Sequence, residues 1–284
     1  MNNFEESLNN KLKMIDDYIL ATIDINCPAE IKNVLKYALF PSGKRIRPLL
    51  ALSVCEMLEG NLEEALPYAV AIELIHPYSL IHDDLPSMDN ADYRRGKPSV
   101  HKAFGEALAI LAGDALLNLA YEIMLKDGNS KYAHVIPKIA EAAGLMGMIS
   151  GQVLDISKNK PSNKEEILHL YSLKTGKLFE VAFNPGYNRR RPIIEEELLE
   201  LGQKIGLAFQ IKDDLLDIYG SEELGKPLGQ DLANEKNTII SFIGVEETEL
   251  IYKNLISDIL KVLDTYNHSE FLTQIIVSLT NRQR

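Results

Sequence analysis

Two adjacent carboxylates at the end of an apolar run are the residues in this sequence best suited to chemistry. The run leads to Asp83 and Asp84, and Pro86 follows two residues later. Because proline lacks an amide hydrogen and disfavours a helical conformation in the residue before it, the helix is predicted to end at Leu85. Both aspartates would then lie on the last turn, and a short loop could return Asp89 to their side.

Neighbouring carboxylates of this kind destabilise the folded chain by electrostatic repulsion unless a cation binds between them. Two carboxylates about 4 Å apart repel by roughly 4 kcal/mol at an effective dielectric constant near 20, and the negative end of a helix adds to that cost. A hard divalent cation would relieve the repulsion, since carboxylate oxygens are its preferred ligands. The plainer alternative is a solvated acidic turn that ends a helix.

A second acidic cluster favours the metal hypothesis. Asp213, Asp214 and Asp217 are spaced so that a helix would bring them to one face, where like charges destabilise an isolated helix. Clusters made only of aspartate argue against zinc, and magnesium is often held jointly by carboxylates and substrate phosphates. His82 beside Asp83 suggests a metal phosphohydrolase instead, but the other histidines form no obvious ligand set.

Positively charged residues gather in a few tight groups although the chain is acidic overall. Lys44 and Arg47 stand at a turn that opens a helix, where side-chain charge and free backbone N–H groups together attract phosphate oxygens. Arg94 and Arg95 directly follow the first acidic cluster, and arginine binds phosphate through two parallel hydrogen bonds. The alternatives are an ordinary basic surface for the first pair and internal salt bridges to the aspartates for the second.

Lysines also follow the second acidic cluster. Lys226 and Lys236 come shortly after it along the chain. Lys174 and Thr175 precede Gly176 late in a predicted helix, where glycine costs roughly 1 kcal/mol and suits a backbone that opens toward a ligand. Each acidic cluster is thus followed along the sequence by basic residues. This arrangement suits the binding of a diphosphate between magnesium ions and basic side chains.

Length and composition indicate one soluble globular domain. The chain has 284 residues, 46% of them hydrophobic and 25% charged, with no linker or low-complexity block, so residues 1–284 are predicted to form a single domain. The net charge of −11 argues against nucleic-acid or anionic-membrane partners. No signal peptide or membrane span is expected, and the two cysteines fit a reducing compartment, so we expect a cytoplasmic protein.

Helical periodicity recurs along the whole chain, whereas the alternation typical of strands is scarce. The sequence therefore predicts an all-α bundle. Residues 101–126 are apolar on nearly every face and belong at the centre of a bundle or at a subunit interface. Helices are predicted over residues 4–23, 28–40, 48–58, 62–85, 101–126, 137–157, 164–183, 193–219, 234–243, 246–266 and 270–280.

These motifs resemble those of the trans-isoprenyl diphosphate synthases, of the bacterial farnesyl diphosphate synthase type. The resemblance runs from residue 43 to residue 282 and includes two aspartate-rich motifs, DDxxxxD at 83–89 and DDxxD at 213–217, with its strongest block at 79–113. The family implies the isoprenoid synthase fold, a large helical bundle around a central cavity, and usually a homodimer.

The resemblance also implies a transferase. Such an enzyme joins isopentenyl diphosphate to dimethylallyl or geranyl diphosphate by magnesium-assisted ionisation, condensation and elimination, and releases farnesyl diphosphate. The resemblance assigns more than one Mg²⁺ to Asp83, Asp84, Asp89, Asp213, Asp214 and Asp217, isopentenyl diphosphate to Lys44, Arg47, His76 and Arg95, and the allylic diphosphate to Arg94, Lys174, Lys226 and Lys236, with Thr175 and Gln210 near the reacting carbons.

The expected mechanism needs no protein nucleophile. Metal ions and cations would spread the charge of the departing diphosphate, which could itself take the proton. Water must be kept from the allylic cation, and Phe209, beside Gln210, could help to line an apolar pocket that binds substrate. The predicted catalytic residues are Lys174, Thr175, Gln210, Asp83 and Asp213.

Product length is expected to depend on Tyr78. It lies five residues before Asp83, roughly 7.5 Å down the helix at about 1.5 Å per residue. In the family an aromatic residue there usually marks a stop at fifteen carbons. Three segments depart from the family pattern: Ala91 replaces a common acid, Thr238 is followed by two isoleucines, and residues 184–192 form a basic stretch predicted to be an exposed loop.

Other functions remain open at this point. A geranylgeranyl diphosphate synthase is the nearest alternative, and its product would distinguish it. Terpene cyclases share aspartate-rich helices but need no isopentenyl diphosphate site, so Lys44, Arg47 and Arg95 argue against them. A non-catalytic helical partner subunit would be expected to lose an acidic motif, and both motifs are intact.

Overall fold

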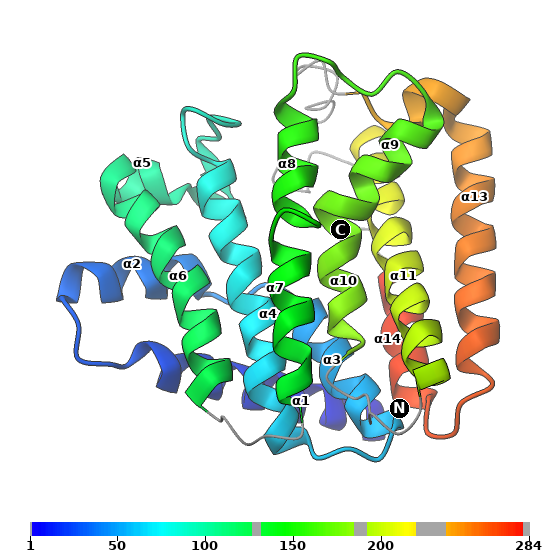
Figure 1. The fold of residues 1–284 in the computed structure, drawn as a ribbon, viewed down its shortest axis with the longest axis horizontal. Coiled ribbons are helices and arrows are strands. Elements are labelled where there is room, and N and C mark those ends of the chain that lie inside the picture. The colour runs from blue at the N-terminus through cyan, green and yellow to red at the C-terminus, as the bar shows by residue number, and fades with distance from the viewer. Residues whose placement is uncertain (1, 127–131, 185–191, 220–236, 281–284) are drawn as a thin grey trace. The chain divides into compact units, whose positions relative to one another are not determined.

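The fold is known from a computed structural model, which describes residues 2–126, 132–184, 192–219 and 237–280 (Figure 1). Over these ranges the regular secondary structure is helical apart from one short hairpin, which confirms the predicted fold class. It divides into two compact units, Met1–Ile136 and Pro137–Arg284. That residues 1–284 act as a single domain stays a prediction.

The first unit is built around α4 (Leu62–Asp83), which is buried on nearly every face. Such a helix is apolar all round, and α3 and α6 pack against it. The side chain of Asn61 begins the helix by accepting the backbone N–H groups of Glu63 and Glu64 at 2.9 and 3.3 Å. The other elements are α1 (Asn2–Ile23), α2 (Ala29–Leu39), α3 (Ile46–Met57), β1 (Tyr93–Arg94), β2 (Lys97–Pro98), α5 (Val100–Phe104), α6 (Glu106–Lys126) and the 3-10 turn η1 (Ala133–Val135).

The second unit is built around α11 (Pro192–Tyr219), a long helix on which α10, α13 and a π-helical turn pack. Its core joins Leu170 and Tyr171 to Ile211, Leu215 and Ile239. The remaining elements are α7 (Ile136–Ala143), α8 (Met148–Ile156), α9 (Lys164–Tyr171), the π-helical turn η2 (Ser172–Gly176), α10 (Lys177–Ala182), α13 (Ile239–Leu263) and α14 (Glu270–Thr280).

Several predicted helices are interrupted in the structure. The helix expected over 101–126 is two helices, because Gly105 adopts a φ of 88° that ends α5. The helix expected over 137–157 is also two, with a break between α7 and α8. The break predicted between residues 243 and 246 is present, because Gly244 has a non-helical φ of 76° that kinks α13 there. Residues 234–236 of the predicted helix over 234–243 lie outside the described residues.

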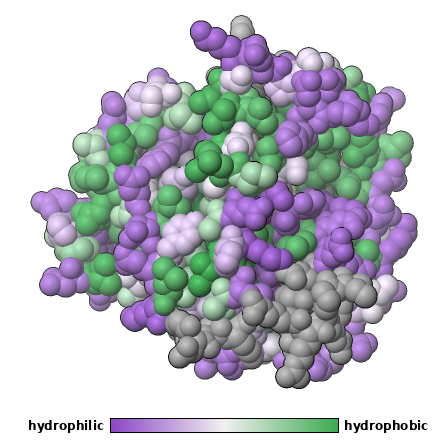
Figure 2. Space-filling view, viewed as in Figure 1, coloured by the Kyte–Doolittle hydropathy of each residue, from purple (hydrophilic) through white to green (hydrophobic). Residues whose placement is uncertain are grey.

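Two segments, Glu106–Lys126 and Ala133–Ile156, are long and apolar enough by composition to cross a membrane. Structure offers another account of their apolar character. One side of α6 is buried against α4, and the second segment is interrupted between α7 and α8. Both also expose large apolar side chains, among them Leu111 at 57% and Val153 at 57%, and Figure 2 shows apolar side chains among polar ones on one face.

Candidate functional site

The first acidic cluster closes the end of α4. The helix ends at Asp83, and the loop after it folds back, so that the backbone N–H of Asp89 donates to the Asp83 carbonyl at 2.9 Å. The N–H of Ala91 does the same for the Asp84 carbonyl at 3.1 Å. These bonds satisfy carbonyls that a helix end leaves without partners. The predicted return of Asp89 to the other two acids is thereby confirmed for the backbone.

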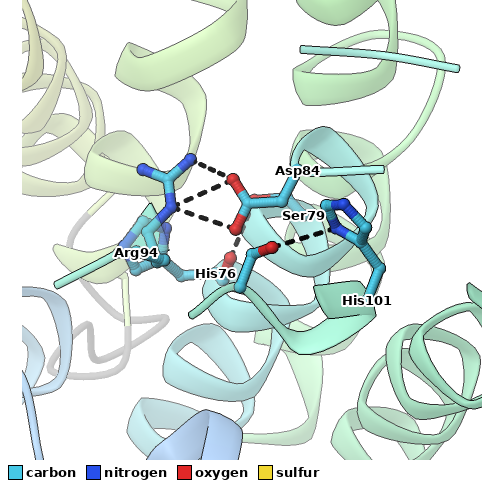
Figure 3. A network of polar contacts seen from close by, with 6 residues as sticks. His76, Ser79, Asp84, Arg94 and His101 are labelled. Atoms are coloured by element: carbon cyan, nitrogen blue, oxygen red, sulfur yellow. Dashed lines mark hydrogen bonds and ion pairs between the residues drawn. The ribbon is translucent and has the colours of Figure 1, made fainter. Parts of the chain in front are cut away.

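Asp84 forms a forked ion pair with Arg94 (Figure 3). The Nη2 atom of Arg94 lies 2.5 Å from Oδ1, and its Nε atom lies 3.1 and 3.2 Å from the two carboxylate oxygens. Asp84 is only 2% exposed. Burial raises the pKa of Asp84, and the bond from Arg94 offsets only part of that rise. The salt-bridge alternative that the sequence left open is therefore realised for Arg94.

The negative charge at the helix end also acts on Arg94. Burial would lower the pKa of this guanidinium, but its hydrogen bond with Asp84 and the charges of Asp84, Asp83 and Asp89 raise it overall. All three acids of the first motif thus lie close enough to Arg94 to influence it.

A group of cations surrounds His76 on α4. Arg95 lies against the turn that begins α3, so close that a Cβ added to Gly43 would be 2.9 Å from the guanidinium carbon. Burial lowers the pKa of His76, and nearby positive charges lower it further, so the imidazole is neutral at neutral pH. Those charges belong to Arg47, Arg95, Arg94 and Arg45. Lys44, the remaining predicted member, is exposed on the same turn.

Arg45 is a residue that sequence reasoning missed. Its side chain is fully buried and donates to Asp16 at 2.9 Å, to Glu73 at 2.9 Å and to the Leu39 carbonyl at 2.8 Å. These bonds join α1, α2 and α4 to the turn that carries Lys44. The signal in the sequence was Glu73, a lone acid inside an apolar helical run, which requires a buried partner.

Tyr78 lies on α4 below the acids, as its spacing predicted. The side chain is 9% exposed, and its ring meets the His82 ring edge to face with centroids 5.2 Å apart. Burial raises the pKa of Tyr78, and the neighbouring Tyr121 and Asp114 of α6 add to that rise. The ring therefore faces α6. Its role in product length stays a prediction.

In the second unit, an open cavity of about 470 Å³ is lined by three of the five predicted catalytic residues, Lys174, Thr175 and Gln210, but not by Asp213. Thr175 donates from Oγ1 to Oε1 of Gln210 at 2.9 Å, and Gln210 donates from Nε2 to Oδ1 of Asp214 at 3.2 Å. Lys174 forms an ion pair with Asp155 at 2.6 Å. Asp155, on α8, was not anticipated from the sequence. The structure thus brings Lys174, Thr175, Gln210 and Asp214 into one polar cavity.

The π-helical turn η2 places Lys174 and Thr175 at this cavity. A Cβ on Gly151 of α8 would lie only 2.3 Å from the Lys174 backbone nitrogen, so α8 approaches the turn as closely as a glycine permits. The backbone departure predicted from Lys174-Thr175-Gly176 is present as a π turn, a form often found at functional sites.

Phe209 lines a different cavity from its neighbour Gln210. It borders an apolar space of about 330 Å³ with Ile205, Tyr252 and Ile276, and its ring lies 5.3 Å from the Phe179 ring. Successive residues of a helix point in directions about a quarter-turn apart, which accounts for the separation. Phe209 as part of a substrate pocket stays a prediction.

The second acidic motif lies on α11 as predicted. Asp214 is buried, while Asp213 and Asp217 are partly exposed. In the ranges that the structure covers, no three His, Cys, Asp or Glu side chains form a group that would hold a metal unaided. Shared ligation with a substrate was the expectation for magnesium from the outset. Lys226, Lys236 and residues 185–191 lie outside the described residues.

Comparison with known proteins assigns the chain to a family. The sequence profile of the family described as Polyprenyl synthetase matches residues 28–276. The chain belongs to the polyprenyl synthetase family. The chain is 42% identical to the farnesyl diphosphate synthase of Geobacillus stearothermophilus over 86% of each chain. It is also 43% identical to the geranylgeranyl diphosphate synthase of Cyanophora paradoxa, over 83% of this chain and 82% of the other.

Solved structures of similar proteins confirm the fold of this chain. An FPP/GFPP synthase from Zymomonas mobilis matches with a TM-score of 0.83 and 34% identity, covering 96% of this chain and 97% of the other. A geranyltransferase from Legionella pneumophila matches with a TM-score of 0.82 and 33% identity, covering 99% and 98%. The family resemblance and the isoprenoid synthase fold that it implied are both confirmed.

Proposed function

We propose that this chain is a farnesyl diphosphate synthase, a transferase that condenses isopentenyl diphosphate with dimethylallyl and then geranyl diphosphate. The observation that carries the proposal is the group of cations around His76, next to the acids that end α4. Guanidinium groups bind phosphate through paired hydrogen bonds. Cations beside the buried carboxylates of Asp83 and Asp84 suit a substrate that brings both a diphosphate and its metal.

We propose magnesium as the metal of this reaction, because the residues present fit it. The expected ligands are oxygen donors only, and burial raises the pKa of Asp84, so a cation there would stabilise a carboxylate whose charge is costly. When bound, the metal would stabilise the negative charge that develops on the departing diphosphate. More than one ion is proposed, with Asp83, Asp84 and Asp89 as ligands in the first unit and Asp213, Asp214 and Asp217 as ligands in the second.

The protein's own groups then have distinct roles. Arg94 and Lys174 would bind the allylic diphosphate. An ion pair with Asp84 already holds Arg94 in place, and an ion pair with Asp155 does the same for Lys174. Lys44, Arg47 and Arg95 would bind the diphosphate of isopentenyl diphosphate, and the neutral His76 would add a hydrogen bond without further charge. Thr175 and Gln210 would orient the reacting carbons as dipoles, since each lies in the polar cavity without a formal charge.

A geranylgeranyl diphosphate synthase is the second candidate, because a relative of that name is as similar to this chain as the farnesyl diphosphate synthases are. Tyr78 favours the shorter product. Its ring fills space beside α4 and α6 that a longer chain would need if the growing chain extends along α4.

The deciding experiment incubates the protein with dimethylallyl and isopentenyl diphosphates and sizes the products by chromatography. We expect a fifteen-carbon diphosphate with Mg²⁺ and none once a chelator is added. A twenty-carbon main product would show that the protein is instead a geranylgeranyl diphosphate synthase. Chain growth that continues in chelator, or no prenyl product with metal present, would refute the metal-dependent reaction itself.

We also propose that the protein is a cytoplasmic homodimer. On α6, Ile110, Leu111 and Leu125 are exposed, and on α8, Val153 and Ile156 are exposed. Apolar side chains gathered on single helices favour a protein contact, and a second copy would remove them from water. Light scattering after size exclusion should give twice the 31.8 kDa mass of the chain. Leu111→Glu should shift that mass toward the monomer.

A further inference from the structure

The hydroxyl of Tyr171 joins the second acidic motif to the start of a different helix. The side chain is 5% exposed and lies at the end of α9. It donates to Oδ2 of Asp214 at 2.5 Å and accepts the backbone N–H of Ile239 at 3.2 Å. An amide can only donate and a carboxylate can only accept, so the order of the protons is determined. The two hydrogen bonds therefore form a series in which the Ile239 amide donates to the Tyr171 hydroxyl and that hydroxyl donates to the Asp214 carboxylate.

The position of Ile239 strengthens this series of hydrogen bonds. Ile239 is the first residue of α13, where backbone N–H groups have no partner within the helix and the helix end carries partial positive charge. The hydroxyl of Tyr171 supplies the missing acceptor. Hydrogen bonds in series polarise one another, so the amide makes the hydroxyl a better donor to Asp214.

Asp214 is held on both sides. Gln210, one turn earlier on α11, donates to Oδ1 at 3.2 Å, while Tyr171 donates to Oδ2. The carboxylate is 4% exposed and borders the polar cavity that Lys174 and Thr175 also line. Two donors on different elements leave it one orientation.

We propose that Tyr171 is a positioning residue that orients Asp214 toward the metal and ties the first turn of α13 to that carboxylate. The inference rests on the proposed function only in taking Asp214 as a metal ligand. It predicts that removing one hydroxyl weakens metal-dependent diphosphate binding and loosens the start of α13 together. Removal of a residue that hydrogen-bonds to a metal ligand typically weakens metal affinity by about ten- to a hundred-fold.

The test uses Tyr171→Phe, which keeps the ring and removes the hydroxyl. Calorimetric titration with inorganic pyrophosphate should show binding weakened about ten-fold at limiting Mg²⁺. Hydrogen exchange followed by mass spectrometry should show the amide of Ile239 exchanging several-fold faster. The matched control is Tyr266→Phe, which removes a hydroxyl that donates to the exposed Glu197 in the same unit, away from the cavity. It should change neither measurement by more than about two-fold.

The Mg²⁺ dependence separates positioning from a loss of general stability. If Tyr171 acts through Asp214, excess Mg²⁺ should restore most of the pyrophosphate affinity of Tyr171→Phe. A deficit that persists unchanged at saturating Mg²⁺ would show a structural role and overturn the proposal, as would wild-type affinity and exchange in the variant. These measurements need no prenyl transfer. Failure to make a prenyl product would therefore refute the proposed function without deciding the role of Tyr171.

Discussion

Replacing Arg45 by methionine should destabilise the first unit strongly, although Arg45 contacts no predicted ligand. The substitution keeps an unbranched apolar side chain but removes a fully buried cation. Glu73, 3% exposed, would lose the guanidinium that donates to it at 2.9 Å, and the Leu39 carbonyl would lose its donor. Removing one partner of a buried ion pair costs about 3–5 kcal/mol, because the other charge stays buried without compensation.

Two features of the structure place the expected cost at the lower end of that range. Asp16, the other acid on Arg45, is partly exposed at 27% and can be solvated by water. The charge of Glu73 also acts on Arg95, which would stay in place. We therefore expect the free energy of unfolding to fall by about 3 kcal/mol. At about 2–4 °C per kcal/mol for a unit of this size, the thermal midpoint should fall by roughly 6–12 °C.

The assay is calorimetric or chemical unfolding of Arg45→Met beside two comparison variants. Lys13→Met breaks an exposed ion pair with Asp17 on the same helix as Asp16, and it should leave the midpoint nearly unchanged. Arg45→Met combined with Glu73→Leu removes both buried charges and should recover much of the loss. The reasoning is refuted if Arg45→Met behaves like the Lys13 variant, or if the double substitution is worse than the single one.

The other two predictions concern α4. Tyr78→Ala should yield products longer than fifteen carbons, because it removes the ring that faces α6; an unchanged chromatographic product profile would count against the role of Tyr78. His76 bears on the pH dependence of stability, since its pKa in the folded protein lies well below the ordinary 6.5. Below pH 6.5 the unfolded chain takes up a proton that folded His76 does not, so stability falls as the pH drops toward the folded pKa. In His76→Gln this part of the decline should be absent in denaturant titrations between about pH 6.5 and 5, and an identical slope in both proteins would show that other groups cause it.

Local signals predicted the end of α4 and the return of Asp89 correctly. Pro86 disfavours a helical conformation in the residue before it, and α4 ends at Asp83, within two residues of the predicted end. Pro67 and Pro77 lie inside the same helix without ending it, so a proline by itself does not define a helix end. Glycine was harder to interpret, because its effect depends on the conformation it adopts. Gly105 breaks a helix that periodicity predicted to be continuous, whereas Gly176 lies in a chain that stays helical through a π turn.

Partners distant in the sequence could not be predicted in the same way. Lys174 was expected to face a diphosphate, and the structure pairs it with Asp155 of α8. Phe209 and Gln210 were expected in one pocket, and they border different cavities. Tyr171 gave no signal at all, since a tyrosine in an apolar helical run reads as ordinary core.

The sequence by itself determined the all-α fold class, where its acids and cations occur, and which family it belongs to, because residue type, spacing and periodicity are local properties. Only the tertiary structure decided that Arg94 forms an ion pair with Asp84, that Arg45 lies between Asp16 and Glu73, and that Tyr171 joins Asp214 to α13. The physical reason is burial. A charge or hydroxyl removed from water must find a partner among the groups that packing brings within reach, and packing is a property of the folded chain.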